Sequence, residues 1–176
     1  MNPQLYGLSS EAWFSACGLP FEPSDIADAR AYLEALGLPL RLPVEPVASW
    51  AHAERIIRNP AWDVSWWERE EAERRAMMRR CVERLGEASA LESLSLAAGA
   101  EHEAIHGAAA VAAARAGVAD QALVRAAAGA ASMAAHGLSL TRLAEAGPDH
   151  LFVRKYALFE GGRWPLGITA GVLHLF

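Results

Sequence analysis

The stretch 97–136 constrains the fold of this 176-residue chain more than any other, because half of its forty residues are alanine. Alanine has the highest helix propensity, and helices with such short side chains can approach one another closely. Gly117 and Asp120 lie near the middle of the stretch, where a residue typical of helix ends is followed by one typical of helix starts. The pattern predicts two helices, 100–116 and 121–136, packed as an antiparallel hairpin.

Helix start and stop signals recur through the rest of the chain. Ser49 and Asp63 precede stretches with apolar residues at helical spacing, and such side chains accept hydrogen bonds from the free N–H groups of a first turn. Three prolines between 38 and 47 oppose a helix or a central strand, so we expect an extended surface connector there. The further helices predicted span 11–17, 25–36, 50–58, 64–85, 87–98 and 140–146.

The pattern changes close to the C-terminus. Apolar side chains alternate with period two over 150–159, which is typical of a strand. Gly161 and Gly162 suit a tight hairpin turn, and the segments 164–168 and 172–176 can add two more strands. These features predict a small antiparallel sheet.

Taken together, the elements predict a mostly α protein of the α+β class. We expect a single domain over 1–176, with a helical body over 1–148 that includes the proline-rich connector 38–47. A small antiparallel β-meander over 149–176 completes it. Pro165 has no N–H to donate to a neighbouring strand, so its strand should lie at an edge.

Composition narrows the partners and the compartment. The net charge of −5 argues against a protein that binds nucleic acid, because that binding needs a surplus of Lys and Arg. No stretch without Asp, Glu, Lys or Arg reaches the roughly 20 residues of a membrane span. Cys17 and Cys81 lack the spacing of a metal or redox pair, and no secretory signal is visible, so we expect a cytoplasmic protein. Lys155 is the only lysine among sixteen basic residues, a bias that suggests a GC-rich bacterial genome.

One short motif carries specific chemistry. His102, Glu103 and His106 form the pattern H-E-x-x-H, in which two histidines on one helical face can bind a zinc ion. Over these five residues the chain resembles zincin-type zinc metalloproteases, which implies zinc as the cofactor and Glu103 as the general base. The structural alternative is a first helical turn, where carboxylates meet the positive end of the helix dipole and imidazoles pack at the edge of the domain.

The surroundings of this motif differ from those of the peptidases. The glycine and third histidine of the metzincin pattern are absent, and 121–136 contains no acidic residue to serve as the gluzincin ligand. In an antiparallel hairpin, however, His136 comes close to His102 and can supply a third nitrogen ligand. A zinc-dependent hydrolase with His102, His106 and His136 as ligands is therefore one alternative.

Large side chains point to a different kind of site. Trp62, Trp66 and Trp67 lie within six positions, and Arg163 directly precedes Trp164. Tryptophan and arginine are enriched where proteins bind one another, although packing one or two of the indoles in the core is the structural alternative. Because catalytic groups are otherwise sparse, we predict a non-catalytic module of the adaptor, chaperone or inhibitor and immunity type. It would bind a partner protein through these five residues without a cofactor, and its partner and oligomeric state stay open.

Overall fold

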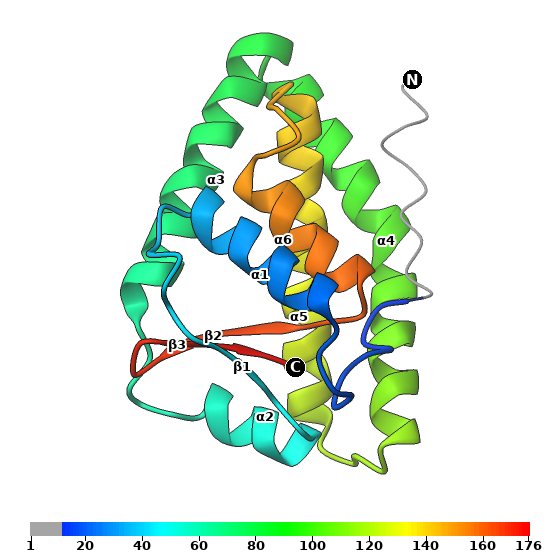
Figure 1. Cartoon of the computed structure of the whole chain (residues 1–176). Helices are drawn as coiled ribbons and strands as arrows, with labels where there is room; N and C mark the ends of the chain where they lie inside the picture. Colours follow the sequence, from blue (N-terminus) through cyan, green and yellow to red (C-terminus); the bar gives the residue numbers. More distant parts are fainter. Residues whose placement is uncertain (1–11) are drawn as a thin grey trace.

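The computed structural model of the chain describes residues 12–176. Within them, six helices and a small three-stranded sheet confirm the mostly α, α+β class (Figure 1). The helices are α1 Pro23–Ala35, α2 Trp50–Ile57, α3 Val64–Leu85, α4 Glu87–Arg115, α5 Gln121–Leu143 and α6 Leu151–Glu160, and the strands are β1 Val44–Pro46, β2 Pro165–Thr169 and β3 Val172–Leu175. The predicted helix 11–17 lies partly outside the described residues, and its described part forms turns.

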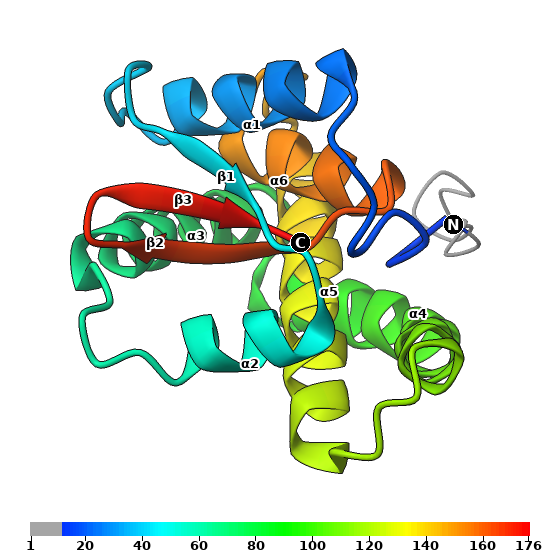
Figure 2. The ribbon, with the colours of Figure 1, turned by 60° about the horizontal axis from the view of Figure 1, so that its bottom comes forward.

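The helices are layered around α5, which runs through the centre of the molecule. Figures 1 and 2 show α3 and α4 on either side of α5, while α6 crosses it and carries α1 on its outer face. The predicted starts of three helices are confirmed, because Ser49, Asp63 and Asp120 each accept a hydrogen bond from a backbone N–H of the turn that follows.

The predicted alanine-rich hairpin is formed by α4 and α5. The two helices run antiparallel (Figure 1) and make the most extensive contact of any pair of described elements. Ala109 and Ala113 of α4 and Ala127 and Ala131 of α5 are fully or almost fully buried in the core that the hairpin shares. Short side chains thus allow close packing, as the composition predicts.

Both helices of the hairpin are longer than predicted. α4 continues through Gly99 without a break, and α5 continues through Gly137 to Leu143. An interior glycine costs a helix only about 1 kcal/mol relative to alanine, so tertiary packing can carry the helix across it. At Gly137 the reason is a close approach, because an added Cβ would lie 2.7 Å from the ring of Phe152 on α6.

The predicted strand at 150–159 is wrong, because this segment forms α6. His150 caps it by accepting a hydrogen bond from the backbone N–H of Phe152. α6 lies between α1 and α5, so it is buried on two sides, and its apolar residues lack the single stripe that marks a surface helix. In so short a segment, the alternation of apolar side chains therefore did not distinguish a strand from a helix that is buried on two sides.

The sheet is mixed, with the strand order β1-β3-β2. β2 and β3 form the predicted antiparallel hairpin, which turns at Ala170-Gly171 as expected. The other predicted hairpin, with its turn at Gly161-Gly162, is wrong, because the segment before these glycines is α6. The third strand comes from the proline-rich connector, where β1 pairs in parallel with β3. Pro165 begins the edge strand β2, as predicted.

A buried polar network joins three of the helices. Lys155 of α6 lies 2.7 Å from a carboxylate oxygen of Glu70 on α3, and both side chains are about one-tenth exposed. The hydroxyl of Tyr32 on α1 donates to the other oxygen of Glu70, and the indole N–H of Trp66 donates to that hydroxyl at 2.7 Å. Burial, together with the adjacent Glu70, raises the pKa of Tyr32 well above its usual value, so Tyr32 remains a donor.

A second buried ion pair fastens the N-terminal segment. The Arg163 guanidinium lies 2.8 Å from Asp25 of α1 and donates to the backbone carbonyls of Ala16, Leu19 and Pro20. Arg163 is only 3% exposed, so these acceptors replace the water that the cation would otherwise bind. Residues 16–20 are thereby held against the helical body.

We expect Gly137→Ala to destabilise the fold by about 1–3 kcal/mol, because the new methyl group would overlap the base of the Phe152 ring. Gly129→Ala is the matched control, since Gly129 lies in the same helix with no atom within 4 Å of its added Cβ. The control should be neutral or stabilising by up to about 1 kcal/mol. Urea unfolding of both variants measures the difference, and equal stabilities would contradict the close approach of α5 and α6.

Lys155→Met should lower the free energy of unfolding by about 3–5 kcal/mol, because it leaves the Glu70 carboxylate buried without its cation. Arg58→Met is the control, since Arg58 pairs with Glu54 at 2.9 Å but is 65% exposed, and it should cost less than about 1 kcal/mol. Similar losses in both variants, measured by urea unfolding, would show that the buried pair does not hold the helices together.

Candidate partner-binding groove

An open groove of about 850 Å³ lies beside α4. Its floor is the C-terminal half of α4, and its walls are the segment 13–19 and the start of α2. Figure 2 shows these three parts on the same side of the molecule. The Arg163 contacts described above hold one wall in place, so the groove is built by tertiary structure and not by one element alone.

Apolar side chains form the walls of the groove. Those that line it are Trp13, Phe14, Leu19, Trp50, Val111 and Phe176. Leu19 at the rim is 57% exposed and Val111 on the floor is 50% exposed, whereas the four aromatic side chains are buried. Exposed apolar side chains that gather beside a cavity are typical of binding surfaces.

The floor of the groove has an unusual composition for a solvent-facing helix. Between Glu103 and Arg115, α4 contains no Asp, Glu, Lys or Arg, although Ala104, Gly107 and Val111 face the groove and are exposed. Surface helices normally carry charged side chains on the face opposite the core. The face also has open space at Gly107, where an added Cβ would have no described atom within 4 Å.

No described residue of the chain requires a glycine at position 107. Helical glycine costs about 1 kcal/mol relative to alanine, and here neither a close neighbour nor an unusual backbone angle requires it. Glycine permits another backbone to approach closely. The floor is therefore suited to contact with a second helix.

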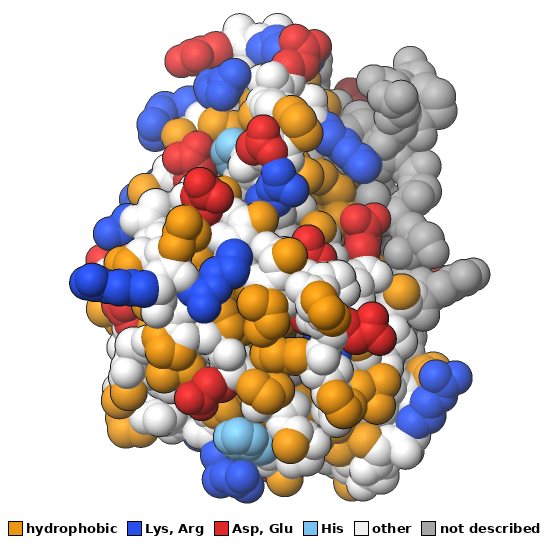
Figure 3. Space-filling model, in the orientation of Figure 1, with side chains coloured by type: hydrophobic (Ala, Val, Ile, Leu, Met, Phe, Trp, Pro, Cys, Tyr) orange, Lys and Arg blue, Asp and Glu red, His pale blue; other side chains and the backbone are white. Residues whose placement is uncertain are grey.

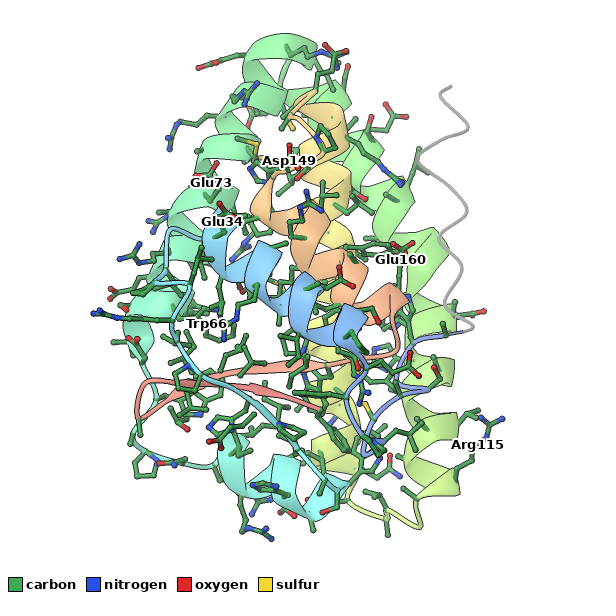
Figure 4. The ribbon with its side chains drawn as sticks, viewed as in Figure 1. Glu34, Trp66, Glu73, Arg115, Asp149 and Glu160 are labelled. Atoms are coloured by element: carbon green, nitrogen blue, oxygen red, sulfur yellow. The ribbon has the colours of Figure 1, made fainter. Side chains whose placement is uncertain are left out.

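Charge in the groove is confined to its two ends. Glu103 and Arg115 are the charged side chains among the described residues that line it, and they lie about 18 Å apart along the helix axis. Figure 4 shows Arg115 projecting from the lower half of α4 away from the body of the molecule. The groove thus has an apolar centre, a negatively charged end at Glu103 and a positively charged end at Arg115.

The polar groups of the groove are not those of an activated nucleophile. Burial raises the pKa of Cys17 to about 12, so the thiol is protonated at neutral pH. Its Sγ lies 3.7 Å from the carbonyl of Gly162, and Ser49 accepts the capping hydrogen bond of α2. The groove offers surface and charge for binding.

The histidines of the H-E-x-x-H motif lie on another side of α4. The rings of His102 and His106 are 4.3 Å apart, and His102 and His136 line one cavity of about 90 Å³ between α4 and α5. Glu103 instead lines the groove. Among the side chains that the structure describes, which do not include that of Glu101, no three of His, Cys, Asp or Glu are grouped so as to hold a metal ion. Burial, followed by the charge of Arg74, lowers the pKa of His136.

The five predicted partner-binding residues differ in how much of their side chains is exposed. Trp67 is 54% exposed, and Trp62 is half-buried with its indole N–H donating to the carbonyl of Ile56. Trp66, Arg163 and Trp164 are 3–5% exposed. This burial is a correction of the expected surface, because the three side chains offer almost no area to a partner: Trp66 and Arg163 belong to the buried networks, and Trp164 packs against Phe14, Trp50 and Phe176.

The groove residues themselves were missed by the sequence reasoning. One signal was available in the sequence: the eleven residues between Glu103 and Arg115 include no charged side chain. A helix that packs against the core on one side normally carries charged residues on its solvent-facing side, so their absence marks this face as unusual. The walls had no comparable signal. Leu19 and Trp50 are brought to α4 only by tertiary packing.

Figure 3 shows that hydrophobic side chains gather over the lower part of one face, whereas charged side chains are denser over the upper part. No helix within residues 12–176 combines the length and the apolar character needed to cross a membrane.

Comparisons of the chain with protein-family models, with curated proteins and with solved structures find no match. The geometry of the described residues therefore carries the functional argument.

The zinc hypothesis can be tested by metal analysis of protein purified without a histidine tag. Because His106 does not line the cavity shared by His102 and His136, we expect far less than one zinc per chain, and no further change in His102→Ala. About one zinc per chain in the wild type, lost in His102→Ala and retained in a His52→Ala control, would establish the metal site instead.

Proposed function

We propose that this protein is a non-catalytic interaction module of the bacterial cytoplasm that binds an apolar helix of a partner protein in the groove beside α4. The observation that carries the proposal is the exposed, uncharged face of α4 at the floor of an 850 Å³ apolar groove. Adaptors, chaperones and inhibitor or immunity proteins all use such binding surfaces. No cofactor is part of the proposal.

A helix fits this groove better than an extended peptide. An extended peptide is usually held by pairing with a free sheet edge, whereas the floor here is a helix whose backbone groups are bonded internally. Packed helices have axes about 8–10 Å apart, depending on the side chains between them. Small residues such as Ala104, Gly107 and Ala108 favour the close end of this range. The apolar walls then cover the flanks of the bound helix.

A zinc-dependent hydrolase is the second candidate. The observation in its favour is that His102 and His136, from different helices, line the same small cavity. The proposal of a binding module is preferred because Glu103, the base that this hydrolase needs, lines the groove instead.

Photo-crosslinking in cells tests the proposed function. A benzoylphenylalanine placed at Val111, on the groove floor, should form adducts with protein, because the occupied groove brings another chain against it. Leu91 is the matched control, since it lies on the same helix outside the groove and is 51% exposed, against 50% for Val111. Adducts that are equally abundant at both positions, or absent at Val111, would refute protein binding in the groove.

A further inference from the structure

We infer that the helix bound in the groove is α4 of a second copy of this chain, packed antiparallel about a twofold axis. The inference rests on the proposed function, since it names the partner of the same groove. It is drawn from the order of charges along α4, from the position of Gly107 and from the exposed apolar rim.

The charges along α4 are complementary to themselves. In an antiparallel pair related by a twofold axis beside Ala109, positions equally far from Ala109 on either side lie at the same level along the two helices. Glu103 lies six residues before Ala109 and Arg115 six residues after it. Each copy therefore places its Glu103 opposite Arg115 of the other, and the pairing occurs twice.

The side-chain sizes are complementary in the same register. Gly107 and Val111 lie two residues before and two residues after Ala109, so Val111 of one copy faces Gly107 of the other. An exposed valine thus meets a position where an added Cβ would have no atom within 4 Å. This explains both the exposed apolar side chain and a helical glycine that no described residue of the same chain requires.

The charged ends of α4 and the apolar rim of the groove favour the antiparallel arrangement of the two copies. A parallel pair would place Glu103 beside Glu103 and Arg115 beside Arg115, and like charges facing each other disfavour that arrangement. Leu19, 57% exposed at the rim, extends the apolar surface beyond the helices and would lie against the bound α4. Burying such a side chain removes apolar area from water.

Charge reversal tests the register directly. Wild-type protein at micromolar concentration should sediment as a dimer, whereas Glu103→Arg and Arg115→Glu should each weaken the dimer by at least about tenfold. An equimolar mixture of the two variants should recover the association as a heterodimer, because each interface then pairs an arginine with a glutamate. Native mass spectrometry separates this heterodimer from the homodimers, and the double variant E103R/R115E should again form a homodimer.

A steric variant provides the control for folding. Gly107→Leu should break the dimer, whereas Gly129→Leu on α5 should leave it intact, because both glycines are exposed in helices with open space around them and only Gly107 lines the groove. Circular dichroism checks that both variants fold.

Two results would overturn the inference. A wild-type monomer would do so, and the proposed function would stand if Val111 still formed adducts with another protein. A dimer unaffected by Glu103→Arg and Gly107→Leu would also do so, because it would use a different surface. Absence of any adduct at Val111 would remove the proposed function as well.

Discussion

The ion pair between Lys155 and Glu70 is the interaction on which the helical layers depend. It joins α6 to α3, and the hydroxyl of Tyr32 extends it to α1. Each of these groups would be costly to bury alone, since removing charge from water is favourable only when a partner replaces the solvent. The three helices are therefore coupled in their relative position, because a shift of any one of them would expose a buried charge or leave it unpaired.

The groove also depends on a buried ion pair, which lies near the N-terminal end of α1. Asp25 lies on α1, and Arg163 joins it to the carbonyls of the segment that forms one wall. The position of Leu19 relative to α4 thus follows from a buried cation and not from a local sequence preference. In our proposal this groove binds a partner, and a surface held in this manner would lose little conformational freedom on binding, which favours affinity.

The two sides of α4 have different explanations. On its inner side, Ile105, Ala109 and Ala113 pack against the core, and short side chains set the close approach to α5. On its outer side, small residues leave a face that has no charged side chain between Glu103 and Arg115. One alanine-rich sequence therefore serves internal packing and, in our proposal, association with a second helix.

The sequence by itself determined the features that depend on local chemistry: the alanine-rich hairpin, the helix starts at Ser49, Asp63 and Asp120, and the edge position of the strand that begins with Pro165. Capping, helix propensity and a missing N–H act within a few residues. Only the tertiary structure decided that 151–160 is a helix, that β1 joins the sheet, and that Trp66, Arg163 and Trp164 are buried while Trp67 is exposed. These outcomes depend on partners far away in the chain, such as α1 and α5 covering both sides of α6, and burial on two sides removes the periodicity from which an element is recognised.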